Sequence, residues 1–151
     1  MLTISGDLLA KMHAHLEAGY PKEACGILLG DVTFQNGATR TAAKSVKDLV
    51  LVPNVWEVES EREGQRNRYL ISPEDVARAD REANRQGLDI VGFFHSHPDC
   101  PSRPSETDRE FAWPVISFVI VSVEKRKAAT TNSWVLRDDR SRFDEEIVQV
   151  S

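Results

Sequence analysis

Two histidines separated by one residue stand out in "GFFHSHPDCPSRPSETD", which runs from Gly92 to Asp108. The segment that leads to them, "LDIVGFFHSH", is nearly continuously apolar until its end, which is typical of a buried strand. Side chains at i and i+2 of a strand point to the same face, so His95 and His97 would present two imidazoles side by side. Neutral imidazoles are common zinc ligands. For an isolated His-x-His pattern, however, one surface histidine and one hydrogen-bonded histidine is the commoner outcome.

The stretch Ser105-Glu106-Thr107-Asp108 that follows admits two interpretations. As local structure, a serine with an acid three residues later resembles a capping box at the start of a helix. As part of a site, Asp108 ends a loop whose three prolines lower the entropy cost of returning its carboxylate to the imidazoles. These prolines are Pro98, Pro101 and Pro104. A His, His, Asp set with one position open is the pattern of a catalytic zinc site.

The spacing His-x-His, seven residues, Ser-x-x-Asp resembles the signature of the JAMM (MPN-plus) metalloproteases. The upstream stretch "YPKEACGILLG" is similar to the second mark of that family, a Glu shortly before a Cys-Gly-x-Leu-x-Gly strand. The likeness extends over nearly the whole chain. It implies a cytidine-deaminase-like JAMM fold of the α+β (α/β-like) class, with a single mixed β-sheet flanked by helices.

The resemblance also implies roles for five residues. His95, His97 and Asp108 would hold one zinc ion per chain, with water as the fourth ligand. Glu23 would hold that water and act as general base and then as acid, and Ser105 would stabilise the scissile carbonyl. This chemistry is coherent on general grounds, because zinc lowers the pKa of its water toward about 7 and a nearby carboxylate can carry the proton. Without the zinc set, Glu23 would be read as a solvated loop residue.

The family cuts peptide or isopeptide bonds after the C-terminal glycines of ubiquitin or ubiquitin-like proteins. Its eukaryotic deubiquitinases carry insertions around the active site, and this chain is short at both insertion points. It therefore looks closer to compact bacterial forms, which act on small sulfur-carrier proteins of the ubiquitin fold. The implied partner is such a carrier or its adduct, with cysteine as one group that is released. A deubiquitinase-like isopeptidase that acts on larger conjugates is the alternative within the family.

Three other classes of protein are alternatives to this interpretation. A zinc deaminase carries His-x-Glu and Pro-Cys-x-x-Cys, whereas here His97 stands two residues after His95 and Cys100 has no partner cysteine at that spacing. A non-catalytic zinc-containing protein-binding module is the second alternative, and the presence of Glu23 weighs against it. A redox protein lacks its Cys-x-x-Cys. Cys25 is expected to be a small core residue, and the role of Cys100 stays open.

The elements that position these residues follow from periodicity and turn signals. One helix is predicted over about residues 5–18, and a second from the cap Ser72 to Gly87. Strands are predicted for "ACGILLGDVTF", "TRTAAKSVKDLVLV", "RYLI", "LDIVGFFHSH", "PVISFVIVSV", "AATTNSWVLR" and "EEIVQV". Asn36-Gly37 is a hairpin signal between the first two strands. "PVISFVIVSV" is too continuously apolar to have a wet face, so we expect it inside the sheet.

The charged stretch 53–68 is predicted as the one long loop. Its part from Trp56 to Asn67 is a candidate for substrate contact through added-strand pairing, and a plain solvated loop is an equally good interpretation.

Composition bounds the class of protein. The 151 residues, 40% of them hydrophobic, indicate one domain over residues 1–151. A net charge of −5 without clustered Lys and Arg argues against nucleic acid as a partner. Two cysteines are too few for a disulfide scaffold, which favours a cytoplasmic location. With no basic leader and no long apolar run, neither a signal peptide nor a membrane span is expected. The oligomeric state stays open.

Overall fold

A single mixed sheet organises the molecule. The computed structural model describes residues 1–34, 42–57 and 64–151, and within them it shows eight strands and three helices. The strand order is β7-β6-β5-β4-β2-β3-β1-β8, in which β4 is parallel to β5 and antiparallel to β2. The predicted α+β class, a mixed sheet flanked by helices, is confirmed. The elements are β1 (Leu2–Ile4), α1 (Gly6–Gly19), β2 (Cys25–Phe34), β3 (Ala42–Val52), α2 (Pro73–Gln86), β4 (Asp89–Pro98), α3 (Glu106–Phe111), β5 (Ser117–Glu124), β6 (Lys127–Leu136), β7 (Phe143–Glu146) and β8 (Val148–Val150).

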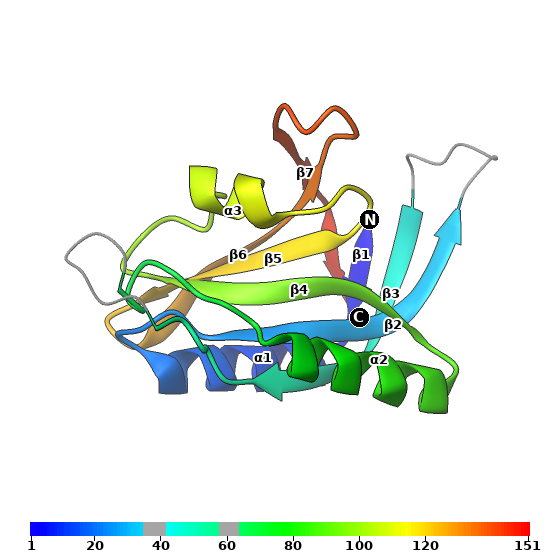
Figure 1. The fold of residues 1–151 in the computed structure, drawn as a ribbon, viewed down its shortest axis with the longest axis horizontal. Coiled ribbons are helices and arrows are strands. Elements are labelled where there is room, and N and C mark those ends of the chain that lie inside the picture. Colours follow the sequence, from blue (N-terminus) through cyan, green and yellow to red (C-terminus); the bar gives the residue numbers. More distant parts are fainter. Residues whose placement is uncertain (35–41, 58–63) are drawn as a thin grey trace.

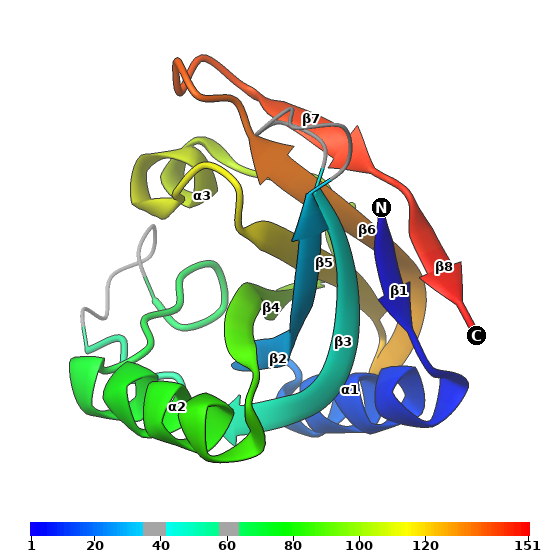
Figure 2. The same ribbon diagram turned by 90° about the vertical axis from the view of Figure 1, so that its right-hand side faces the viewer.

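The sheet is strongly curved (Figures 1 and 2), and in Figure 2 β7 and β8 follow one another along its upper right side. β7 and β8 are the two outermost strands in this order. β7 ends at Glu146 and β8 begins at Val148, so only Ile147 separates them in the chain. The Leu2 N–H donates to the Ile147 carbonyl over 2.8 Å. The prediction of one strand for "EEIVQV" is therefore wrong: the segment forms two strands, which pair with β6 and with β1.

The first two helices cover opposite faces of the sheet, because side chains alternate along each strand. α1 buries Met12 and Leu16 in a core cluster that also holds Leu28 of β2. α2 buries Ala79 and Ala83 in a second cluster with Cys25, Ile27 and Leu29 of the same strand. Cys25 is fully buried, as expected of a small core residue.

The glycines of the Cys-Gly-x-Leu-x-Gly strand have a packing role. A Cβ built on Gly26 would lie 2.1 Å from the Phe94 ring of β4, and one on Gly30 would lie 2.0 Å from the Ser45 carbonyl oxygen of β3. Either contact is far inside van der Waals distance, so a larger residue would displace the Phe94 ring at Gly26 and the backbone of β3 at Gly30. These glycines allow β2 to sit tightly between β3 and β4, which positions the start of β2 beside the end of β4.

Local signals predict the second helix closely. Ser72 accepts a hydrogen bond from the Asp75 N–H at 3.1 Å, Pro73 occupies the first helical position, and Gly87 ends the helix with a left-handed φ of 70°. Ser5 caps α1 in the same way, through the Leu8 N–H at 3.2 Å. β5 lies inside the sheet between β4 and β6, as its apolar run predicts.

Other predictions differ from the structure. "RYLI" is not a strand: it makes one backbone hydrogen bond, from the Val55 N–H to the Leu70 carbonyl at 2.9 Å, while the Leu70 N–H donates to the Asn54 side chain at 3.0 Å. β1 was not predicted, since three residues carry too little pattern. The Asn36-Gly37 hairpin signal lies outside the described residues. No helix in the described part of the chain is long and apolar enough to cross a membrane.

Candidate metal centre and its neighbourhood

The two histidines lie at the carboxyl end of β4, on the face that α2 and α3 share. His95 is 1% and His97 9% exposed. Ser96, between them, faces the other way and is bonded to Ala24, the residue before β2: its N–H donates to the Ala24 carbonyl at 3.0 Å, and its Oγ accepts from the Ala24 N–H at 2.9 Å. This pair of bonds fixes the end of β4 against the residue that follows Glu23.

The structure brings His95, His97 and Asp108 together. The two Nε2 atoms are 3.1 Å apart, and each lies 3.3 Å from an oxygen of the Asp108 carboxylate. The Nδ1 of His97 lies 2.8 Å from the Pro101 carbonyl oxygen, which can only accept, so Nδ1 carries a proton and Nε2 of the neutral ring carries the lone pair. Two imidazole nitrogens and a carboxylate that converge in this way form a donor set that fits a divalent metal ion.

The pKa shifts of these three residues bear on whether they can hold a metal ion. Burial alone would raise the pKa of Asp108, but the two histidines beside it outweigh burial and hold this pKa well below its ordinary value. Burial lowers the pKa of His95, which favours the neutral ring. Burial is the largest single influence on His97 and opposes its charge, yet the hydrogen bond to Asp108, the charges of Asp108 and Glu23 and the Pro101 carbonyl together outweigh burial and raise the pKa of His97. A metal ion would therefore compete with a proton at His97.

Asp108 takes part in a helix cap and also lies beside the histidines. Ser105 caps α3 by accepting from the Asp108 N–H at 3.1 Å, and the Asp108 Oδ2 accepts from the Ser105 N–H at 2.8 Å, which completes a capping box. The same Oδ2 lies against His97. The capping box therefore aims the carboxylate at the histidines. Ser105 itself is exposed.

The loop from His97 to Ser105 is held from the neighbouring strands. The Ser122 hydroxyl of β5 donates to the Cys100 carbonyl at 2.6 Å, and the Trp134 indole of β6 donates to the Ser102 carbonyl at 3.0 Å. These bonds flank Pro101, whose carbonyl orients His97. Cys100 is a free, exposed thiol whose backbone alone takes part in this arrangement.

Glu23 lies between α1 and β2, buried beside the histidines. Its Oε1 is 3.9 Å from the His97 Nε2, and Glu23, His95 and His97 each offer a ligand atom within 4.8 Å of the others. Its N–H donates to the Gln65 carbonyl at 2.6 Å, and its own carbonyl accepts from the Asn54 side chain at 3.0 Å. Burial raises the pKa of Glu23 to about 8. The described ends of the 53–68 loop thus position Glu23, a role that no pattern in the sequence indicated.

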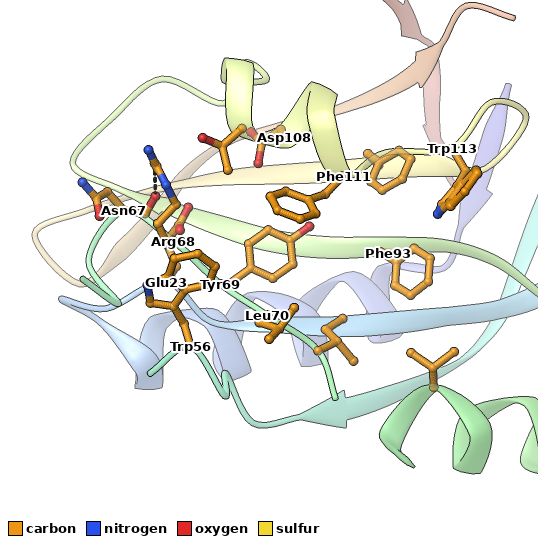
Figure 3. Close-up of a pocket in the computed structure, with 14 residues that line it drawn as sticks. Glu23, Trp56, Asn67, Arg68, Tyr69, Leu70, Phe93, Asp108, Phe111 and Trp113 are labelled. Atoms are coloured by element: carbon orange, nitrogen blue, oxygen red, sulfur yellow. Dashed lines mark hydrogen bonds between the residues drawn. The ribbon is translucent and has the colours of Figure 1, made fainter. Parts of the chain in front are cut away.

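An apolar cavity of about 250 Å³ opens beside the centre. Figure 3 shows Glu23 and Asp108 toward one end of it and Trp113 toward the other. Phe111 and Trp113 stand on its rim, 64% and 65% exposed. Trp56, Asn67 and Arg68 from the described ends of the 53–68 loop, together with Tyr69, Leu70, Ile71, Val76, Phe93, Thr107 and Phe118, complete the lining.

One lining residue touches the centre directly. The Tyr69 ring stacks on the His95 imidazole, with ring centroids 4.4 Å apart and the planes inclined by 23°. Burial raises the pKa of the Tyr69 hydroxyl well above its ordinary value, so this group is a neutral phenol. Reasoning from sequence missed Tyr69 because it was placed in a strand, where its ring would pack on sheet neighbours.

Two histidines at the end of β4 and an aspartate on α3 converge beside a curved mixed sheet and form a candidate metal centre. The chain belongs to the prokaryotic homologs of the JAB domain, whose family model matches residues 5–137. This membership confirms the resemblance drawn from the spacing of the histidines, Ser105 and Asp108.

Relatives with described activities cover most of the chain. It is 32% identical over 138 residues to the desampylase of Haloferax volcanii, which covers 88% of this chain and 87% of that protein. It is 28% identical over 129 residues to a Thermus thermophilus protein described as a "Probable TtuB-protein conjugate cleaving protease", with 85% and 74% covered. A second desampylase, from Pyrococcus furiosus, is 35% identical over 82 residues, with 53% and 55% covered.

Solved structures agree on the fold. A protein from Desulfitobacterium hafniense superposes with a TM-score of 0.80 at 26% identity, over 100% of this chain and 93% of that one. A protein from Salinibacter ruber gives 0.71 at 37% identity, over 99% and 91%. A JAB1/MPN domain protein from Archaeoglobus fulgidus, at 17% identity and a TM-score of 0.57 over 100% and 97%, shares the fold.

Proposed function

We propose that this protein is a zinc-dependent hydrolase that cleaves a peptide or isopeptide bond after the C-terminal Gly-Gly of a small ubiquitin-like sulfur-carrier protein. Cysteine attached to the carrier is one group that it would release. The convergence of the His95 and His97 Nε2 atoms on the Asp108 carboxylate is the observation that carries this proposal. The relatives described as desampylases and as a conjugate cleaving protease support the choice of reaction.

In this proposal His95, His97 and Asp108 hold one zinc ion per chain, with water as the fourth ligand. Zinc, when bound, lowers the pKa of water toward about 7 and polarises a substrate carbonyl. The protein then has to bind the substrate, move a proton and stabilise the charge that develops on the carbonyl oxygen.

Glu23 is the proposed proton carrier. Its carboxylate takes a proton from the attacking water and returns it to the leaving amine. Burial raises the pKa of Glu23 to about 8, and a cation in the centre would lower this pKa, because nearby positive charge favours the ionised form. The Glu23 backbone makes two hydrogen bonds, one to the Gln65 carbonyl and one from the Asn54 side chain. These bonds hold Glu23 in place for this task.

Ser105 is the proposed donor to the scissile carbonyl. Its oxygen already accepts from the Asp108 N–H, and no described residue receives its hydroxyl proton. A hydroxyl in this state can still donate one hydrogen bond to an oxygen that gains negative charge.

The cavity beside the centre is the proposed site for the carrier's extended tail. Glycine at the end of that tail lets the backbone approach the centre closely, because it has no side chain to hold it away. Trp56, Asn67 and Arg68 border the cavity and would contact the tail from one side, in line with added-strand pairing by the 53–68 segment.

Carrier–cysteine and carrier–peptide fusions test this function. Mass spectrometry should show cleavage after the second glycine, blocked by a chelator and restored by zinc, and suppressed when that glycine is replaced by alanine. Lys-linked diubiquitin is the comparison substrate. Faster cleavage of diubiquitin than of every carrier adduct would overturn the substrate class in favour of a deubiquitinase-like isopeptidase. A zinc-loaded protein that binds carriers and cuts none of these substrates would instead be a binding module.

A further inference from the structure

The two histidines of the metal centre are held in different ways. His97 has its Nδ1 fixed by the Pro101 carbonyl at 2.8 Å. The Nδ1 of His95 is buried and has no hydrogen-bond partner among the described residues. Histidines that bind metals almost always anchor their second ring nitrogen in this way, which sets the ring's orientation. Some other contact must therefore orient His95.

The contact that fills this gap is the Tyr69 ring. It lies nearly parallel to the imidazole, at 4.4 Å between centroids, which is a stacking geometry. Tyr69 is itself fixed by its chain neighbours: the Asn54 side chain donates to the Arg68 carbonyl and accepts from the Leu70 N–H, both at 3.0 Å. A ring held on both sides by its backbone is a firm platform for the imidazole.

The Tyr69 hydroxyl has a separate property. No hydrogen bond joins it to any described residue, and it belongs to the lining of the cavity beside the centre (Figure 3). Much of that lining is aromatic, with Phe93, Phe111 and Phe118 among it. A free donor in a mainly apolar wall is the kind of group that fixes a ligand's orientation. A Gly-Gly tail offers only backbone groups, so the acceptor that such a donor finds is a peptide carbonyl.

We propose that Tyr69 is a positioning residue for His95 and, through its hydroxyl, a recognition residue that donates to a backbone carbonyl of the extended substrate tail. The second role rests on the proposed function. The first concerns the metal centre alone. The ring keeps the His95 Nε2 directed at His97 and Asp108, and the hydroxyl holds the tail alongside.

Two substitutions separate the roles. Tyr69→Phe keeps the ring and removes the hydroxyl, whereas Tyr69→Leu removes both. Tyr69→Met repeats the second change with a side chain that adapts its shape, in case the leucine variant folds poorly. Phe34→Leu is the matched control, since it makes the same kind of change at an exposed position at the far end of β2.

The first readout is metal binding without substrate. Competition with a chromophoric chelator should show zinc affinity reduced about tenfold or more in Tyr69→Leu and Tyr69→Met, and the visible spectrum of the Co²⁺-loaded variants should change. Tyr69→Phe and Phe34→Leu should match the wild type within about twofold. Wild-type affinity and an unchanged Co²⁺ spectrum in both aliphatic variants would overturn the positioning role.

The second readout is the kinetics of carrier cleavage by the zinc-loaded protein. Tyr69→Phe should lower kcat/KM about 3- to 10-fold through a higher KM, the effect of one lost hydrogen bond in binding. An unchanged KM would overturn the recognition role while leaving the positioning role intact. A wild type that binds no zinc at all would overturn the proposed function together with the positioning role, a pattern distinct from the other two.

Discussion

The proposed metal centre and a second buried polar cluster belong to the same sheet, and they differ in how their members pair. The second cluster, which we call the ion-pair cluster, consists of Lys44, Ser117, Ser133 and Glu146. Lys44 donates to the Ser117 Oγ at 2.7 Å and pairs with Glu146 at 3.4 Å, and both serine hydroxyls donate to the Glu146 Oε1, at 2.7 and 2.8 Å. Each acceptor in this cluster faces a donor.

The metal centre is arranged in the opposite way. The two Nε2 atoms face each other and the Asp108 carboxylate, the Glu23 carboxyl lies beside them, and the His95 Nδ1 has no partner. A buried polar group without a complementary partner costs free energy, so a cluster of acceptors is stable only when a proton or a cation joins them. The comparison teaches that the ion-pair cluster is complete in the folded chain, whereas the proposed metal centre needs a proton or a cation to join its groups.

Among the substitutions, removal of a proposed metal ligand should have the largest effect. We expect His97→Ala and Asp108→Ala to lose most of their zinc and nearly all turnover, because a three-ligand site cannot spare one ligand. Elemental analysis of the purified variants checks this. Ser133→Ala, which removes one hydroxyl from the ion-pair cluster, is the control and should keep its zinc. Full zinc occupancy in either ligand variant would reject this ligand set.

Glu23→Gln should separate metal binding from proton transfer. The amide cannot accept a proton from water, so we expect turnover to fall by about two orders of magnitude or more while zinc and fold are kept. Steady-state kinetics with a carrier fusion, alongside metal analysis, gives the measurement. Activity close to that of the wild type would remove Glu23 from the mechanism and leave the metal site in place.

Ser105→Ala should have an intermediate effect. Loss of one donor to the developing oxyanion predicts turnover reduced about tenfold to a few hundredfold, and loss of the cap predicts about 1 kcal/mol less stability. Ser5→Ala is a matched control, since Ser5 caps α1 in the same manner and lies away from the centre. If the two variants lose the same stability and neither loses turnover, Ser105 acts as a cap only.

Lys44→Met should have the smallest effect on turnover and the largest on stability. It leaves the buried Glu146 without its main positive partner, so we expect a loss of about 3 kcal/mol in the free energy of unfolding. Urea denaturation measures this, and Lys44→Met combined with Glu146→Leu should recover part of the loss. Zinc affinity and turnover should stay within about twofold. A large drop in zinc affinity would show that the two clusters are coupled and would weaken the comparison.

Features that depend on neighbours in the chain were predicted from sequence. The caps of α2 at Ser72 and Gly87 are set by local backbone geometry, and the shared face of His95 and His97 follows from the period of a strand. The capping box of Ser105 and Asp108 is local as well. The return of Asp108 to the histidines was expected from the stiff loop between them, and the structure shows the strands that hold this loop.

Features that depend on distant segments were missed or wrong. Tyr69 and Leu70 carry apolar side chains with the pattern of a strand, but their ring and backbone contacts go to His95 and Asn54 instead of a sheet neighbour. The strand "EEIVQV" breaks at Ile147 because the curved sheet brings its two edges together there. Neither the curvature nor the position of Asn54 leaves a trace in local sequence.

Zinc titration of the metal-stripped wild-type protein tests the central claim most directly. The fraction of zinc bound and the rate of carrier cleavage are measured in the same samples at each addition. We expect one equivalent of zinc to bind per chain, with activity absent at the start and rising in step with occupancy. Full cleavage activity in the stripped protein, or folded protein that takes up no zinc, would contradict the assignment of this centre.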